Sequence, residues 1–368
     1  MQYIHELEDW PNFFWDDGKL SKLLATARFH QGRLLGHMET VGLAKKNETN
    51  LSTLTADVVK SSEIEGELLP EDQVRSSIAR RLGMNIAGLI PSDRNVDGVV
   101  EMMLDATQGF EKPLTKERLF DWHAALFPTG RSGMSKIAVA RWRDESSRPM
   151  QVVSGPYGHE RVHFEAPSAN KIEKEMAGFV RWFNDESKLD AVLKSAIAHL
   201  WFVTIHPFED GNGRIARAIS DMQLARSENS KNRFYSMSSQ IRDERNTYYR
   251  ILEFTQRGPN LDITQWLEWF LSCLNRALIN AELTINDVLN KARFWELNEE
   301  IPLNDRQRSM LNKLLDKFEG KLTSTKWAKM TKTSQDTALR DITDLVERGI
   351  LIKDQGGGRS TSYSLKPF

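Results

Sequence analysis

The sequence contains a single cysteine, Cys273, in 368 residues. One cysteine cannot form a disulfide within the chain, and such sparse use of cysteine suits a reducing compartment. The formal net charge of −1 gives no overall attraction to nucleic acid or to an anionic membrane. No apolar run reaches the roughly 20 residues that a membrane-spanning helix needs. The N-terminus also lacks the basic and then apolar pattern of a signal peptide, so we expect a soluble, cytoplasmic protein with no membrane partner.

The most informative stretch, residues 200–217, is a glycine-containing loop between two helices. Apolar residues recur at helical spacing before it, at Leu193, Ala196, Ile197, Leu200 and Trp201, and after it, at Ile215, Ile219 and Met222. Pro207, Gly211 and Gly213 end the first helix, because proline lacks a backbone donor and glycine allows conformations that other residues avoid. The second helix should therefore begin near Asn212.

A loop that leads into a helix N-terminus is a site for an anion. Free backbone N–H groups and the positive end of the helix dipole meet there. Arg214 and Arg217, three residues apart on the first turns, add two positive charges on the same side. Asp210 offers a hard oxygen ligand for Mg²⁺, and His206 can exchange a proton near neutral pH. These residue types together indicate a site that transfers a phosphate-containing group.

Residues 206–217, H-P-F-E-D-G-N-G-R-I-A-R, match the Fic motif, H-P-F-x-[DE]-G-N-G-R-x-x-R, at every fixed position. The chain thus resembles the Fic (Fido) family, and the resemblance implies transfer of AMP from Mg-ATP to a protein hydroxyl. It further implies that His206 is the base and that Asp210 holds Mg²⁺. The implied ATP and phosphate ligands are Gly211, Asn212 and Gly213 in the anion hole, with Arg214 and Arg217 on the outer phosphates. The alternative is a relic of the fold that binds nucleotide without turnover.

A second short pattern lies upstream, at the end of an expected helix over residues 51–64. Residues 61–66, S-S-E-I-E-G, fit the [ST]-x-x-x-E-[GN] inhibitory pattern common in the family that the chain resembles, with Ser61, Glu65 and Gly66 at the fixed positions. The resemblance implies that Glu65 pairs with Arg217 and so competes with the γ-phosphate of ATP, since carboxylate and phosphate bind a guanidinium alike. Its neighbours Glu63 and Glu67 should matter much less. The alternative is an ordinary helix C-terminus with Gly66 just beyond it.

Residues 150–167 predict a β-hairpin in an otherwise helical chain. Two β-prone arms, 152–153 and 162–164, flank turn-forming Gly155, Pro156 and Gly158. In the family that the chain resembles, such a hairpin is called the flap and docks the protein target. Pairing through backbone hydrogen bonds makes few demands on the target's sequence. The alternative is a hairpin with a structural role only.

The segment from residue 242 to residue 253 is expected to open a further helix. In the resembling family this region borders the nucleoside, so Asn246, Tyr248 and Tyr249 are candidates for the nucleoside pocket, although tyrosine pairs in helices are more often core residues. His123 and His199 are interpreted as structural helix residues, with nothing near them that supports metal binding.

The C-terminal residues, 301–368, carry a net charge of +5, which leaves −6 on the remainder. Helices are expected over 305–318, 323–330 and 334–348, and strands over 350–353 and 360–365, which is the order of a winged helix-turn-helix. Thr337, Arg340 and Asp341 are expected on the outer face of the third helix. Four carboxylates on that helix weaken the case for DNA, so a protein partner is as consistent with the sequence as DNA.

We therefore expect a mainly α fold with a Fic-type helical core and a β-hairpin flap. The expected domains are 1–112 (N-terminal helical domain with the inhibitory helix), 113–276 (catalytic), 277–300 (connecting helix) and 301–368 (winged helix). The leading hypothesis is a self-inhibited protein adenylyltransferase that modifies a Ser, Thr or Tyr hydroxyl of a target or of itself, with homodimerisation and AMP removal left open. The alternative is a nucleotide-sensing transcriptional regulator.

Overall fold

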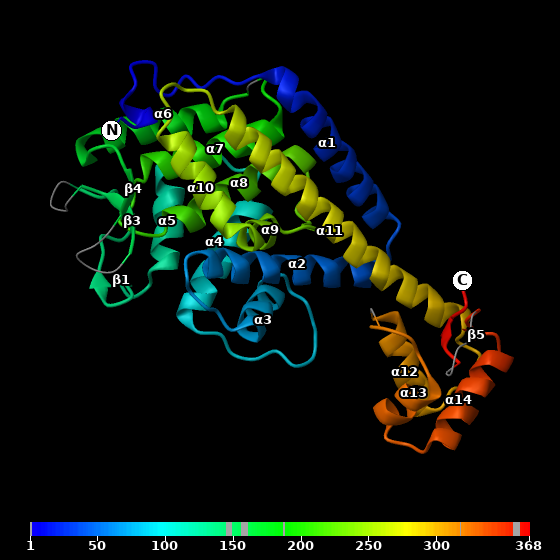
Figure 1. Ribbon diagram of the computed structural model, residues 1–368. Coiled ribbons are helices and arrows are strands. Elements are labelled where there is room, and N and C mark those ends of the chain that lie inside the picture. The colour runs from blue at the N-terminus through cyan, green and yellow to red at the C-terminus, as the bar shows by residue number, and fades with distance from the viewer. Residues whose placement is uncertain (1, 145–148, 156–160, 187, 317, 356–360) are drawn as a thin grey trace. The chain divides into compact units, whose positions relative to one another are not determined.

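The computed structural model describes residues 2–144, 149–155, 161–186, 188–316, 318–355 and 361–368. These residues form two compact units, Met1–Ala281 and Glu282–Phe368 (Figure 1). The fold is mainly helical, as the sequence predicts. None of the helices in the described part of the chain combines the length and apolar character that a membrane span requires.

The first unit is built on two packed helices, α7 (Ala191–Ile205) and α8 (Asn212–Glu228). Residues 192–205 of α7 are all buried, which is typical of a helix that is apolar on every side and lies in the core. The surrounding helices are α1 (Asp17–Glu39), α2 (Leu43–Ile64), α3 (Glu71–Arg81), α4 (Arg94–Gln108), α5 (Lys116–Leu126), α6 (Ile172–Asn184), α9 (Met237–Asp243) and α10 (Arg245–Gln256). Figure 1 shows α2 as one unbroken rod, and it packs against α3 and α9.

Two helices differ from the sequence prediction at their ends. The helix that carries the inhibitory pattern begins at Leu43, eight residues before the predicted start. The single helix expected to open at Arg242 is instead two helices, because the chain breaks at Glu244, which caps both α9 and α10. Gly66 lies just beyond α2 with φ of +84°, the left-handed conformation predicted for the residue after a helix end.

Two small hairpins lie in the first unit. The first pairs β1 (Arg131–Ser132) with β2 (Ser135–Lys136). The second pairs β3 (Gln151–Ser154) with β4 (Arg161–Glu165) in antiparallel register, with an irregularity between Val152 and Val153. The predicted arms of the flap therefore form, while Pro156 and Gly158 of its predicted turn lie outside the described residues.

The long helix α11 (Thr264–Leu297) runs from the first unit into the second. The second unit contains α12 (Asp305–Leu315), α13 (Ser324–Thr331) and α14 (Gln335–Glu347), followed by the antiparallel pair β5 (Leu351–Lys353) and β6 (Tyr363–Leu365). The helix and strand order is the predicted one. Its core is formed by Met310, Leu311, Trp327, Ile342 and Leu345.

One prediction for this unit is wrong. Asp341 does not lie on the outer face of α14, because it is buried and its carboxylate accepts hydrogen bonds from Arg306 Nε at 2.8 Å and from Asn304 Nδ2 at 3.0 Å. The helix therefore turns this acidic residue inward, where α12 and its N-cap supply the donors. Arg340 is exposed, as predicted, and Thr337 is half-buried.

Candidate active site

The loop between α7 and α8 owes its shape to two residues with positive φ. His206 ends α7 in the left-handed conformation, with φ of 52° and ψ of 58°, which is uncommon for a residue with a side chain. Gly211 precedes α8 with φ of +80°, and a Cβ there would lie 2.9 Å from Phe127 Cε2 and 3.2 Å from Leu126 Cδ1. Only glycine fits position 211, so the backbone requires the first glycine of the G-N-G sequence.

His206 is arranged as a proton acceptor. Its Nδ1 lies 3.1 Å from the Val203 carbonyl, and a carbonyl can only accept, so Nδ1 carries the proton and Nε2 keeps its lone pair. Burial lowers the pKa of His206 to about 4, so the ring is neutral near pH 7. Arg143 holds the backbone behind it, because its Nε donates to the His206 carbonyl at 2.8 Å and its backbone N–H to the Pro207 carbonyl at 3.0 Å. The histidine is therefore held in the form that can take a proton.

The N-terminus of α8 holds a carboxylate. Of the side chains that the structure describes, none caps this helix end. The Glu65 carboxylate lies there instead: a Cβ on Gly213 would be only 2.1 Å from Glu65 Oε1. A negatively charged oxygen at a helix N-terminus is in a favourable electrostatic position. Glu65 thus occupies the place that the sequence assigns to a phosphate.

The predicted pair between Glu65 and Arg217 is present in the structure. Arg217 Nη2 donates to Glu65 Oε1 at 2.8 Å, and the Arg217 side chain is only 1% exposed. Ser61 completes the contact, because its hydroxyl accepts from Arg217 Nε and its carbonyl from Nη2, both at 2.8 Å. Burial acts to lower the pKa of Arg217, but the Glu65 carboxylate and the nearby hydroxyls of Tyr248 and Tyr249 together outweigh it, so the pKa is raised. Nη1 is buried without a partner among the described residues, so the hydrogen-bonding capacity of this guanidinium is only partly used.

Arg214 is also paired with a carboxylate, that of Glu67. Its Nη1 donates to Glu67 Oε2, and the guanidinium lies 5.1 Å from the centre of the Phe127 ring. The Arg214 side chain is 6% exposed and that of Glu67 38% exposed. Both arginines of the motif therefore contact carboxylates from residues 61–67.

The two acidic residues of the motif have different surroundings. Asp210 is half-buried; its Oδ1 accepts the Gly211 N–H at 2.5 Å, and its Oδ2 accepts the hydroxyl of Ser132 on β1. Glu209 Oε2 accepts the Ala138 N–H at 3.0 Å, so this residue supports the loop. Within the described residues no group of three or more His, Cys, Asp or Glu side chains could hold a metal ion. A lone carboxylate can hold Mg²⁺ where phosphates and water supply most of the ligands, and the half-buried Asp210 carboxylate fits that requirement.

Asn212 has a role that the sequence did not reveal. Its side chain is buried against the loop, where Oδ1 accepts the Phe208 N–H at 3.0 Å and Nδ2 donates to the Phe208 carbonyl at 2.8 Å. The side chain fixes the turn, and only its backbone N–H remains for an anion.

The three candidates for the nucleoside pocket do not lie together on an open surface. Tyr248 is 1% exposed, and its hydroxyl lies 3.0 Å from Nε2 of buried His199, so it is a core residue. Tyr249 is 36% exposed, and its hydroxyl donates to the carbonyl of Ile64, the last residue of α2, at 3.3 Å. Asn246 is exposed. The structure therefore places Tyr249 near the site but gives Tyr248 no surface for a ligand.

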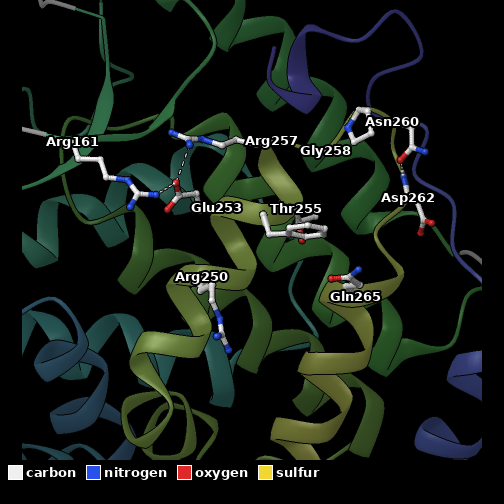
Figure 2. Close-up of a pocket in the computed structure, with 11 residues that line it drawn as sticks. Arg161, Arg250, Glu253, Thr255, Arg257, Gly258, Asn260, Asp262 and Gln265 are labelled. Atoms are coloured by element: carbon white, nitrogen blue, oxygen red, sulfur yellow. Dashed lines mark hydrogen bonds and ion pairs between the residues drawn. The ribbon is translucent and has the colours of Figure 1, made fainter. Parts of the chain in front are cut away.

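The flap is anchored to α10 through one of its strands. Glu253 on α10 binds Arg161 at 2.8 Å and His163 Nδ1 at 2.6 Å, both on β4, and Arg257 also reaches Glu253 at 2.9 Å. Figure 2 shows Arg161 and Arg257 converging on this carboxylate at one side of a pocket of about 470 Å³. In the described part of the chain β4 is the only strand paired with β3, and Gln151, Val153 and Ser154 of β3 are exposed.

Two family models match the chain. Residues 113–224 match the Fic/DOC family, and residues 3–84 match a domain of unknown function (DUF4172). The protein named protein adenylyltransferase Fic of Drosophila melanogaster is 32% identical over 114 residues, which are 30% of this chain and 21% of that protein. The protein named protein adenylyltransferase fic-1 of Caenorhabditis elegans is 41% identical over 66 residues, 17% of this chain and 13% of that protein. The matched segments thus span about a fifth or less of these relatives.

Two solved structures share the fold. A Fic family protein from Desulfovibrio desulfuricans aligns with a TM-score of 0.51 and 21% identity over 96% of this chain and 97% of that one. A Fic domain containing signaling protein from Bacteroides thetaiotaomicron aligns with a TM-score of 0.50 and 22% identity, over 72% of this chain and 95% of that one. The region from residue 113 to residue 224 is therefore similar to Fic/DOC domains, and the two solved structures share the fold of this chain.

Proposed function

We propose that the protein is a self-inhibited protein adenylyltransferase that transfers AMP from Mg-ATP to a hydroxyl of a protein. The observation that carries the proposal is the position of His206, whose free Nε2 stands in the same loop as an uncapped helix N-terminus and two buried arginines. The similarity to relatives named protein adenylyltransferase supports the same reaction.

The proposed transfer is a single displacement at the α-phosphorus. The target hydroxyl oxygen forms a bond to the α-phosphorus, the bond from that phosphorus to the oxygen bridging to the β-phosphate breaks, and pyrophosphate leaves. The hydroxyl proton passes to His206 Nε2. Positioning and charge stabilisation by the backbone N–H groups at residues 212–214, together with Arg214 and Arg217, supply most of the rate in such a reaction.

The proposed metal ligand of the chain is Asp210. Mg²⁺ held there would neutralise phosphate charge and so lower the repulsion met by the incoming oxygen. The Ser132 hydroxyl and the Gly211 N–H orient the carboxylate through its two oxygens.

We infer that Glu65 inhibits by occupying the position of a phosphate. Its carboxylate binds Arg217 and lies over Gly213, so ATP cannot use that arginine until Glu65 leaves. Because Glu65 lies within residues 3–84, the inhibitory residue belongs to a different family match from the catalytic loop.

The target is proposed to dock on the flap through the edge of β3 away from β4, by addition of one further strand. The second unit has the element order of a winged helix, and exposed Asp336, Arg340 and Glu347 give α14 an outer face of mixed charge. A mixed surface favours a protein partner over DNA. No described residue favours a nucleotide-sensing transcriptional regulator.

The proposal is tested by incubating the chain, and its Glu65→Gly variant, with ATP labelled at either the α- or the γ-phosphate, with and without bacterial lysate. AMP transfer labels protein from α-labelled ATP only, whereas phosphorylation would label it from γ-labelled ATP. His206→Ala is the matched control, because it removes the base and leaves the arginines in place. Absence of α-label in protein from the Glu65→Gly variant would contradict the proposed activity.

A further inference from the structure

His123 on α5 contacts the loop between α7 and α8. Its side chain is fully buried, and its ring stacks on Phe208 with centroids 4.1 Å apart and planes 8° from parallel. Its Nε2 lies 3.2 Å from the Asp210 carbonyl oxygen, and its Nδ1 lies 3.2 Å from the Ala140 backbone nitrogen. A histidine in the last turn of α5 thus connects the segment at Ala140 with the loop at Asp210.

These two neighbours fix which nitrogen carries the proton. The Ala140 N–H can only donate, so Nδ1 must present a lone pair. The Asp210 carbonyl can only accept, so the proton is on Nε2 and points to it. The neutral ring therefore has one tautomer that satisfies both neighbours, and in it the histidine donates to the backbone of the residue whose carboxylate is the proposed metal ligand.

We propose that His123 is a positioning residue that holds the Asp210 backbone and thereby aims its carboxylate at the metal. The proposal rests on the role given to Asp210 in the proposed function. The Asp210 side chain is short, so a change in its backbone moves the carboxylate directly. Ser132 and the Gly211 N–H hold the carboxylate oxygens, while His123 and its stack on Phe208 hold the peptide group behind them.

Two amide substitutions separate this role from core packing. In His123→Gln the side-chain amide reaches the place of Nε2 and can donate to the Asp210 carbonyl. In His123→Asn it reaches only the place of Nδ1, where it can still accept from Ala140. Both variants lose the ring stack, so a role in packing alone predicts the same defect in both.

The test measures ATP binding by calorimetry in a Glu65→Gly background, once with Mg²⁺ and once with EDTA. We expect His123→Asn to weaken Mg-ATP binding about 5- to 30-fold, the usual effect of one lost buried hydrogen bond, with metal-free ATP within about threefold of the parent. His123→Gln should stay within about threefold of the parent in both conditions. Equal losses in the two variants, or losses of the same size with EDTA, would overturn the proposal.

The binding readout keeps this proposal distinct from the proposed reaction. If the parent binds Mg-ATP and the two variants separate but no AMP is transferred, the positioning role stands and the transferase proposal fails. If AMP is transferred and the variants do not separate, the reverse holds. If Mg²⁺ has no effect on ATP binding by the parent, there is no metal carboxylate to position, and the proposal for His123 is refuted.

A different observation, the contact between Glu67 and Arg214, carries a second inference. Arg214 is almost fully buried and its Nε has no partner among the described residues, while the Glu67 carboxylate and the face of Phe127 contact its guanidinium. ATP would need this arginine for a phosphate. We infer that Glu67 is a second inhibitory carboxylate, which competes for Arg214 as Glu65 competes for Arg217.

The variants Glu67→Gln and Glu63→Gln provide a matched pair. Glu63 lies two residues before Glu65 and binds Lys60 and Arg242, neither of which belongs to the motif. In a Glu65→Gly background we expect Glu67→Gln to tighten ATP binding about 2- to 10-fold, a modest change because Glu67 is partly exposed, and Glu63→Gln to change it less than twofold. Unchanged or weaker ATP binding by the Glu67→Gln variant would overturn the inference.

Discussion

Replacing Glu65 by glycine should convert the protein from a weakly active form to an active one. The structure sets the magnitude. The carboxylate makes one charged hydrogen bond of 2.8 Å to Arg217, whose side chain is 1% exposed. Such a bond contributes about 1.5–3 kcal/mol, and ATP must displace it to use the same guanidinium. Its removal should therefore raise ATP affinity and transfer at limiting ATP roughly 10- to 150-fold.

Ser61 makes this prediction specific. Because it still offers its hydroxyl and carbonyl oxygens to Arg217, the arginine should remain in place when Glu65 is removed. Activity is measured as self-labelling and lysate labelling from α-labelled ATP over a range of ATP concentrations. The double variant Glu65→Gly, Arg217→Ala should return to low activity, since the arginine that was released is then missing. Glu63→Gly, on the same helix but bound to Lys60 and Arg242, is the control.

The competition argument fails if Glu65→Gly labels no faster than the wild type at any ATP concentration. It also fails if the rise survives removal of Arg217, because the activating effect would then not pass through the arginine. An equal rise in Glu63→Gly would mean that any loosening of the helix end suffices.

The remaining predictions concern the loop and the buried histidines. His206→Ala should abolish transfer and leave ATP binding within about threefold, because the base and the phosphate ligands are separate groups, as single-turnover labelling and calorimetry would reveal. Asp210→Ala should lose the Mg²⁺-dependent part of ATP binding, and unchanged Mg-ATP affinity would point to another ligand. His199 has a pKa lowered by burial to about 3 against 6.5 for a free histidine, so the unfolded chain binds a proton below pH 6.5 that the native chain does not. Stability owed to this neutral ring is therefore lost as pH falls, by about 1.4 kcal/mol between about pH 7.5 and 5.5, and His199→Gln should remove that loss; identical pH dependence of urea unfolding in the two proteins would refute it.

The sequence was sufficient to predict those parts of the structure whose contacts are local or are specified by one motif. The loop from His206 to Gly211 leads directly into α8, so its residue types predict both the turn and the start of α8 at Asn212. The glycine after Glu65 likewise marks the end of α2, and the β-prone arms of the flap pair as expected. The pair between Glu65 and Arg217 was accessible only because a family resemblance connected two segments that are 152 residues apart.

Contacts between distant segments were missed where no motif connected them. Glu67 and Arg214 are 147 residues apart, and His123 and Asp210 are 87 apart, so neither pair leaves a local spacing that could be recognised. A charged residue near a helix end also looks the same in sequence whether it faces water or a buried arginine. Pairing can be inferred from sequence only when a pattern names both partners.

Asp341 and Tyr248 are buried because of contacts with another helix, which the sequence pattern of their own helix does not reveal. A carboxylate on a helix is expected to face solvent, but α12 presents Arg306 to Asp341 and makes an inward position favourable. Tyr248 was a candidate for the nucleoside pocket on the family resemblance alone, and the structure gives it the core position that is commoner for such tyrosines, with His199 as the partner of its hydroxyl. In both cases the deciding group comes from another helix, and a helical periodicity contains no information about that group.

Because α2 is unbroken, it connects the contact of Asn50 with the position of Glu65 at the end of the helix. The helix spans Leu43–Ile64, and near its start the Asn50 side chain accepts the backbone N–H of Arg233 at 2.7 Å. The end of the helix lies 14 residues further on, about 21 Å away at the rise of an α-helix. A helix without a kink transmits a shift or a rotation along its axis with little loss, so a displacement at the buried contact between Asn50 and the Arg233 backbone would also move Glu65. The contact of Glu65 with Arg217 therefore depends on how α2 is packed along its length, and not only on the residues around the carboxylate.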